Sequence, residues 1–166
     1  MKHQIKHLAK ITSGIYLKGK PSGDVFNLQA RDVDEFYRFR KGLSPTAFSD
    51  AKVEKHYLHK GDVLVASKGN DFFAVVYNEE YSPAVASSIF LVIRNLDIHR
   101  VVPEYLSWYI NHPKTQHFFK SVSKGTSLPT INKNYLASLE IPLPSIEKQK
   151  KIVLFDNLKV RRMRLP

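Results

Sequence analysis

The sequence predicts an α+β fold: a mixed, largely antiparallel twisted β-sheet with a few packed helices and a C-terminal helix. Three observations predict it. Short β-rich runs separated by Gly, Asn and Asp fill the middle of the chain, helical patterns that begin at prolines follow, and the last twenty residues contain no glycine. With 166 residues, 43% of them hydrophobic, the chain is long enough to bury one core.

The first sixty residues predict two strands and a long irregular stretch. Residues 9–17 form the first candidate strand, and residues 25–29 alternate apolar and polar side chains, as a half-exposed strand does. Residues 31–58 are mixed and polar. We expect irregular structure there, with one short helix near residues 33–39.

The next segment predicts a hairpin and a third strand. Residues 63–67 and 72–77 are β-rich runs, and Lys68–Asp71 between them contains Gly and Asn, which tolerate positive φ. A tight antiparallel hairpin is the simplest arrangement of these residues. Residues 88–94 contain a continuous apolar run from Ile89 to Ile93 and predict a strong strand.

Helical patterns begin at Pro103, because proline suits the first position of a helix. The apolar side chains that follow share one helical face: Tyr105, Leu106, Tyr109 and Ile110. Pro113 ends this helix or starts the next one. Residues 139–144 contain two prolines and therefore suit the edge of a sheet.

The last segment predicts a helix with Ser145 as its N-cap. Apolar residues recur there at a spacing of seven: Ile146, Val153 and Val160. Gln149 and Asp156 occupy the companion positions, so the coiled-coil signal is weak. We therefore divide the chain into a globular domain, residues 1–144, and a C-terminal helix, residues 145–166.

Positive charge is the strongest feature of the composition. The net charge is +11, and the first and last twenty residues each contribute +5 of it. Such an excess suits a phosphate backbone, an anionic membrane surface or simply a solvated basic face. Because no apolar run is long enough for a membrane span and the first residues lack the apolar stretch of a signal peptide, we expect a soluble cytoplasmic protein without a membrane partner.

The residues that could carry chemistry do not form a recognisable catalytic or metal site. There is no cysteine, which excludes disulfides, a thiol nucleophile and a Cys-ligated zinc ion. The paired histidines and acids lack the spacing of a metal site: His56 and His59, His112 and His117, Asp32 with Asp34 and Glu35, and Glu79 with Glu80. No glycine-rich fingerprint for a nucleotide or S-adenosylmethionine is present. We expect no enzyme activity, no cofactor and no metal.

Three stretches resemble the target-recognition domain of type I restriction-modification specificity subunits. Residues 58–69, with Gly61-Asp62-Val63-Leu64, look like the family's entry into a strand, and Val102–Ile110 is similar to its "PEYL" helix. The third stretch runs from Gly125-Thr126-Ser127 through Ile131-Asn132-Lys133 to Ile141-Pro142-Leu143-Pro144 and Glu147–Ile152. The resemblance covers most of residues 55–153.

The resemblance implies a sequence-specific DNA-binding subunit. Such subunits read double-stranded DNA, while methyltransferase subunits, and through them the restriction subunit, act on it. A typical subunit has two recognition domains joined by long helices, whereas this chain looks like a half-subunit that forms a homodimer or is a truncated remnant. An inactive or assembly-only piece and a small metal-dependent nuclease remain as alternatives.

The resemblance also divides the candidate DNA contacts into two groups. Base contacts are expected where the family pattern is silent, because members read different sequences, and side chains able to pair with base edges occur there. Those residues are Arg31, Arg38, Arg40, Lys41, Lys68 and Asn70. Phosphate contacts are expected from hydroxyls and lysines of the Gly125–Lys133 loop and the residue before it. Those residues are Lys124, Thr126, Ser127 and Lys133.

Overall fold

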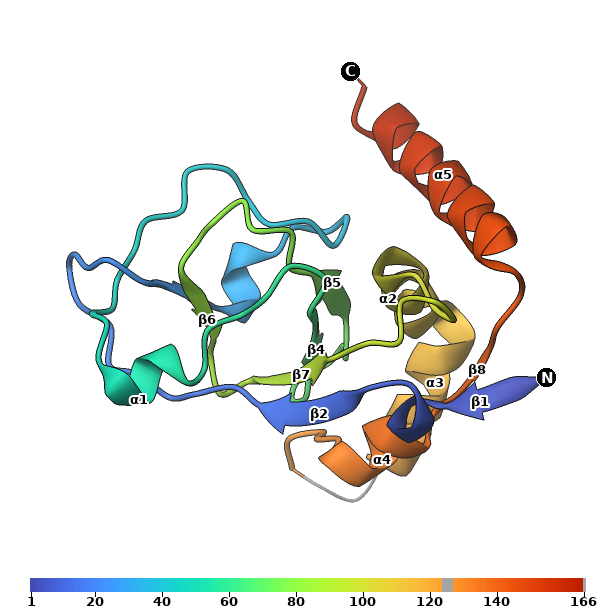
Figure 1. Cartoon of the computed structure of the whole chain (residues 1–166), viewed down its shortest axis with the longest axis horizontal. Coiled ribbons are helices and arrows are strands. Elements are labelled where there is room, and N and C mark those ends of the chain that lie inside the picture. The colour runs from blue at the N-terminus through green and yellow to red at the C-terminus, as the bar shows by residue number, and fades with distance from the viewer. Residues whose placement is uncertain (124–126, 166) are drawn as a thin grey trace.

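A four-stranded antiparallel sheet lies at the centre of the computed structural model, which describes residues 1–123 and 127–165 (Figure 1). Its strand order is β2 (Lys10–Ser13), β7 (Phe90–Arg94), β4 (Val63–Ala66) and β5 (Ala74–Val76). All four strands lie within predicted ones, and β4 and β5 pair as the predicted hairpin. The α+β class with mostly antiparallel strands and a C-terminal helix is confirmed.

Two smaller sheets complete the β-structure. β1 (Lys2–Gln4) pairs antiparallel with β8 (Glu140–Pro142), and β3 (Phe26–Leu28) pairs parallel with β6 (Ala84–Ala86). β8 is the predicted edge segment. The sequence did not indicate β1 or β6, because β1 is polar and β6 has only three residues, two of them alanines, which have little intrinsic strand preference.

The helix predicted near residues 33–39 is wrong. These residues form a turn closed by a bridge between Val33 and Phe39. The Asp34 carboxylate accepts hydrogen bonds from the backbone N–H groups of Phe36 and Arg38, at 2.8 and 3.1 Å, and Tyr37 has a φ of +61°. An aspartate that bonds the backbone ahead of it stabilises a turn in competition with a helix. The short helices in this region are η2 (Ala30–Asp32) and α1 (Ala51–Glu54).

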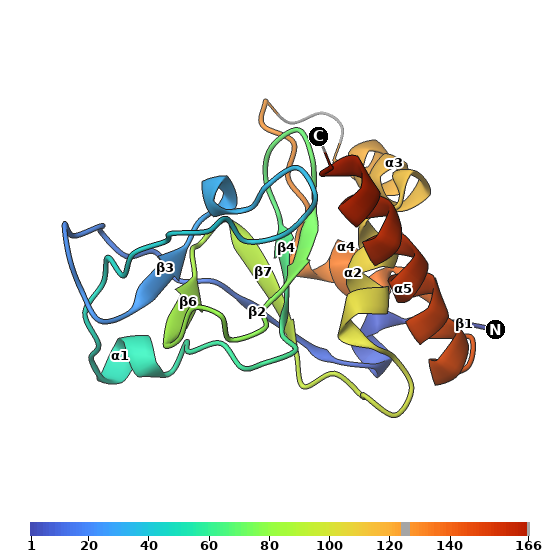
Figure 2. The ribbon, with the colours of Figure 1, turned by 90° about the horizontal axis from the view of Figure 1, so that it is seen from above.

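The remaining helices lie at the end of the molecule opposite α1 (Figures 1 and 2). η1 (Ile5–His7) follows β1, and α2 (Pro103–Asn111) and α3 (Pro113–Val122) both begin at the predicted prolines. α4 (Lys133–Ser138) was not predicted. α5 (Ile146–Met163) has the predicted Ser145 as its N-cap, and the Ser145 hydroxyl accepts a hydrogen bond from Lys148 N–H. Among the described residues, none of these helices is long and apolar enough to cross a lipid bilayer.

Two apolar clusters pack against opposite faces of the central sheet. On one face, side chains of β4 and β7 meet those of α2, α3 and α4; this cluster includes Val63, Val65, Leu106, Ile110 and Phe119. On the other face they meet the β3–β6 pair and the turn at residues 33–39; that cluster includes Leu64, Phe90, Val92, Leu28 and Phe39. The period-two alternation of β4 decides which residue enters which cluster.

Tyr105 links α2 to β8, and its ionisation lowers the stability of the fold at alkaline pH. Its hydroxyl donates to the Pro142 carbonyl at 2.7 Å, and burial raises the pKa of Tyr105 to about 12 from 10.0. Because the folded pKa is the higher one, the stabilisation is fully present below about pH 10 and is lost as pH rises towards 12. We expect urea unfolding to show a loss of up to about 2–3 kcal/mol over that window.

Tyr105→Phe, which has no phenol to ionise, should lose less stability over the same window. Tyr16→Phe is the matched control, because Tyr16 is exposed. Identical pH slopes in wild type and Tyr105→Phe would contradict the assignment.

Candidate nucleic-acid interface

Three segments, far apart in sequence, lie next to one another and form what we call the loop edge. They are η2 together with residues 33–41, residues 67–73 and residues 127–130. In Figure 2 they follow the upper side of the molecule. Two contacts join them: Tyr37 stacks on Phe73 with ring centroids 6.3 Å apart, and the Gly69 N–H donates to the Pro129 carbonyl at 3.0 Å. All six predicted base-contact residues and Ser127 lie on this edge.

Three of the predicted base-contact residues project freely from the loop edge. Arg31 lies in η2, and Lys68 and Asn70 lie in the connection between β4 and β5. All three are exposed, and their side chains make no hydrogen bond or ion pair with another described residue. Their donors are therefore available to a ligand.

The other three predicted base-contact residues are already engaged within the chain. Arg38 donates to the Phe36 and Tyr37 carbonyls and, through Nη2, to Asn157 Oδ1 of α5 at 2.7 Å. Arg40 Nε donates to the Arg31 carbonyl at 3.1 Å. These contacts hold the turn in shape, so their side chains have a structural use that the sequence did not reveal.

Lys41 differs, because its only described partner lies on the surface. Its ammonium is 3.1 Å from Glu80, and its side chain is 91% exposed. An exposed ion pair of this kind contributes roughly 0–1 kcal/mol, so Lys41 can exchange its partner at little cost.

The predicted phosphate contacts are only partly described. Ser127 is exposed at the end of the loop edge, and Lys133 is the exposed first residue of α4, after the N-cap Asn132. Lys124 and Thr126 lie outside the described residues. Sequence reasoning missed Lys120 of α3, which reaches the same edge through an ion pair with Asp71 at 3.4 Å. No local spacing connects those two residues.

The Gly61-Asp62 pair has an architectural role. Gly61 has a φ of +92°, which favours glycine, and the buried Asp62 carboxylate accepts from His59 N–H and from Arg94 Nη2, at 2.8 and 3.0 Å. Arg94 Nη2 also donates to the Tyr57 carbonyl at 2.8 Å. This motif therefore fixes the turn that leads into β4 and leaves no group free for DNA.

Gln149 attaches α5 to the rest of the fold. Its side chain is fully buried; Oε1 accepts from Val102 N–H at 2.8 Å, and Nε2 donates to the carbonyls of Arg100 and Pro144, each at 2.9 Å. The residue that interrupts the heptad pattern is thus the residue that holds the helix in place.

Three residues of the acidic and histidine pairs serve as caps or turn residues. Asp32 Oδ2 accepts from Gln29 N–H, Asp34 closes its turn, and His112 Nδ1 caps α3 by accepting from Lys114 N–H. Within residues 1–123 and 127–165, no three His, Asp or Glu side chains gather as metal ligands. The geometry offers surface donors on the loop edge rather than a reactive centre.

Comparison with known families decides the relationship. The model of the type I restriction modification DNA specificity domain matches residues 22–155. The chain belongs to this family. The match begins well before residue 55, where the resemblance in the sequence begins, so the domain includes β3, η2 and the 33–41 turn. This family specifies DNA targets and is not a family of methyltransferases or nucleases.

Members of the family with curated names are distant relatives. The chain is 24% identical over 149 residues to the type I restriction enzyme MjaVIII specificity subunit of Methanocaldococcus jannaschii, covering 76% of this chain and 35% of the relative. It is 27% identical over 104 residues to the EcoBI specificity subunit of Escherichia coli, covering 63% and 22%. The chain thus spans about a third or less of the relatives' length, as one target-recognition domain would.

Solved structures of the DNA specificity family share the fold. The HsdS subunit from Thermoanaerobacter tengcongensis superposes with a TM-score of 0.65 at 16% identity, over 98% of this chain and 37% of that one. The S subunit from M. genitalium gives 0.61 at 15%, over 99% and 39%. Nearly the whole chain, α5 included, therefore has a counterpart in specificity subunits.

Proposed function

We propose that this chain reads a DNA sequence for a type I restriction-modification system and has no catalysis of its own. The observation that carries the proposal is the loop edge: donors of Arg31, Lys68 and Asn70 are free on segments that the fold brings together in a family of DNA specificity domains. Lysines and backbone groups would position the phosphates, and the free side chains would read base edges in the major groove.

The proposal assigns partner binding to α5. Methyltransferase subunits, and through them a restriction subunit, would dock on its exposed apolar stripe, which includes Leu154, Phe155 and Leu158. Phe155 is 78% exposed. The predicted heptad residues are less suited, because Val153 packs against the chain's own core cluster. Residues 1–144 would then be the recognition domain and residues 145–166 the docking helix of a cytoplasmic complex.

If the chain acts as a half-subunit, two copies would form a homodimer through the same stripe of α5. Because two-fold protein symmetry imposes two-fold symmetry on the target, such a dimer would read an interrupted palindrome. Sedimentation with and without Phe155→Ser tests the dimer. A single monomeric species at all concentrations of the wild type would remove it.

Selection of duplexes from a randomised DNA library tests sequence reading. The expected result is an enriched sequence that binds at least about 10³-fold more tightly than its shuffled version at 150 mM salt. Equal affinity for both duplexes, with equal salt dependence, would refute specificity and leave the assembly-only alternative. Cleavage of either duplex in Mg²⁺ would favour the nuclease alternative.

Two substitutions on the loop edge separate base reading from phosphate contact. Asn70→Ala should lower affinity for the selected duplex by about 1–3 kcal/mol and relax preference at one base pair. Lys68→Ala decides which contact Lys68 makes: weaker binding to both duplexes with a salt slope reduced by about one assigns it to phosphate, and a relaxed preference at one base pair assigns it to a base. Lys55→Ala, next to α1 and off the loop edge, is the charge-matched control and should change neither. If Asn70→Ala kept the wild-type affinity and base preference, the role of Asn70 in reading bases would be contradicted.

A further inference from the structure

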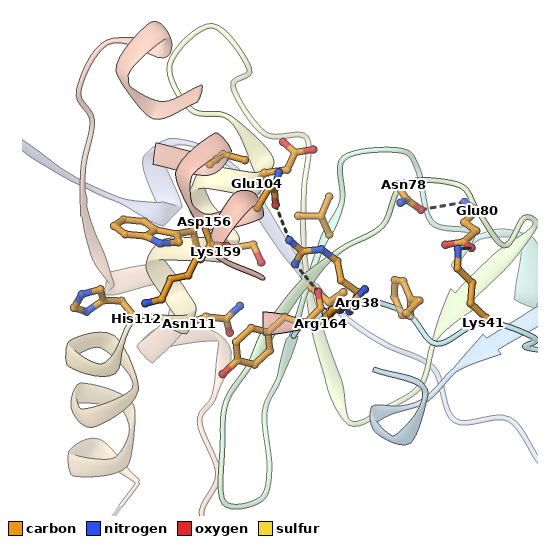
Figure 3. Close-up of a pocket in the computed structure, with 18 of the residues that line it drawn as sticks. Arg38, Lys41, Asn78, Glu80, Glu104, Asn111, His112, Asp156, Lys159 and Arg164 are labelled. Carbon is orange, nitrogen blue, oxygen red and sulfur yellow. Dashed lines mark hydrogen bonds and ion pairs between the residues drawn. The ribbon is translucent and has the colours of Figure 1, made fainter. Parts of the chain in front are cut away.

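α5 is attached to the body at two separate places. Near its start, Gln149 makes the three buried hydrogen bonds described above, and Ile152 and Val153 pack against the core. At its far end, contacts resume with the 33–41 turn, which belongs to the loop edge. Between the two places lies a cleft of about 780 Å³, lined by residues of α2, Trp108 among them, and of α5. Figure 3 shows Asn111 of α2 and Asp156 of α5 in its lining.

The far attachment consists of three contacts on one small turn. Arg164 Nη2 donates to Asp34 Oδ2 at 2.6 Å, and its guanidinium lies 4.7 Å from the centre of the Phe36 ring. Asn157, two helical turns earlier, accepts from Arg38 at 2.7 Å. Because residues 157 and 164 are seven apart, they lie on the same face of α5.

The same turn is also the part of the loop edge that touches the β4–β5 connection. Asp34 Oδ1 holds the N–H groups of Phe36 and Arg38, while its Oδ2 holds Arg164. Tyr37, at the tip, has positive φ and stacks on Phe73. One carboxylate thus joins the end of α5 to a turn whose tip stacks on Phe73 of the connection that contains Lys68 and Asn70.

We propose that Arg164 and Asn157 are positioning residues that fix the 34–38 turn in the conformation needed to read DNA. The inference rests on the proposed function of the loop edge. It adds that α5, the proposed docking helix, is connected through Asp34 to the loops proposed to read DNA. A positive-φ residue at an exposed turn is unfavourable by itself, so the contacts from α5 add to the local hydrogen bonds that keep the turn in one conformation.

Amide hydrogen exchange tests the tether without DNA. In Arg164→Ala, the amides of residues 36–38 should exchange about tenfold faster, since an exposed ion pair and a cation–π contact are lost together. Amides of β4 and β7 should keep their wild-type rates. Arg161→Ala is the matched control, because Arg161 lies at the same helix end and its exposed side chain makes no hydrogen bond or ion pair with a described residue. Unchanged rates at residues 36–38 in Arg164→Ala would overturn the proposal.

Asp34→Asn separates the tether from the turn itself. The amide oxygen can still accept from Phe36 and Arg38, whereas the charge that holds Arg164 is gone. Fluorescence of Trp108, the only tryptophan, should change in Arg164→Ala and Asp34→Asn alike, because Trp108 faces the cleft that α5 closes. A change in neither variant would show that the far end of α5 does not depend on Asp34 and would count against the tether.

DNA binding then tests what the tether does. With the selected and shuffled duplexes, Arg164→Ala should lower the affinity ratio about tenfold and leave the salt slope unchanged. If Arg164→Ala instead lost equal affinity for both duplexes and showed a smaller salt slope, Arg164 would be a phosphate contact and the positioning role would be overturned. If the wild type prefers no duplex, the proposed function fails, while the exchange rates still decide whether the tether exists.

Discussion

Replacing Gln149 with alanine is expected to lower the free energy of unfolding by roughly 3–5 kcal/mol. The side chain is fully buried and satisfies one N–H and two carbonyl groups, on the segment 100–102 and at Pro144. Alanine leaves all three without a partner and opens a cavity between α2 and α5. Urea unfolding at neutral pH, followed by far-UV circular dichroism, measures the loss.

The control is Lys150→Ala, because Lys150 is the exposed neighbour on the same helix. It should change stability by no more than about 0.5 kcal/mol. Gln149→Glu should still accept from Val102 N–H but cannot donate to the two carbonyls, so it should also be strongly destabilising. A cost below about 1 kcal/mol for Gln149→Ala would mean that α5 is held by its apolar contacts instead.

Replacing Arg94 with alanine is expected to cost about 3–5 kcal/mol, because it leaves the Asp62 carboxylate buried without its ion partner. The side chains of Asp62 and Arg94 are only 6% and 15% exposed. The turn at residues 57–62 also loses the hydrogen bond from Arg94 to the Tyr57 carbonyl. Thermal and urea unfolding of the variant give the effect.

Lys10→Ala is the matched control, because Lys10 lies opposite Arg94 on β2 and is exposed. It should be close to neutral. A double-mutant cycle with Asp62→Ala separates the ion pair from the turn that Asp62 also closes. A coupling energy near zero would contradict the assigned ion pair.

Much of the local structure could be predicted from sequence because its cause is local. Pro103 and Pro113 begin helices since proline suits the first helical turn, and Ser145 caps α5 through the nearby Lys148 N–H. The turn at 33–39 was misread because an aspartate that starts a turn and one that starts a helix look alike in sequence.

The candidate site also contains some residues that could be judged from the sequence and others that could not. Exposed Arg31, Lys68 and Asn70 could be nominated from residue type, and the structure leaves them free on one edge. Arg38 could not be judged by type, since its partner Asn157 lies 119 residues away. The engagement of Arg38 and the tether at Asp34 exist only once α5 has folded back against the turn.

The sequence by itself determined the fold class, the family resemblance and the elements that begin at a proline or a cap, because those depend on residues within one or two turns of each other. Only the tertiary structure decided the β1–β8 and β3–β6 pairs, the assembly of three distant segments into one edge and the double attachment of α5. These features depend on burial and pairing between distant segments, for which no local spacing is a signal.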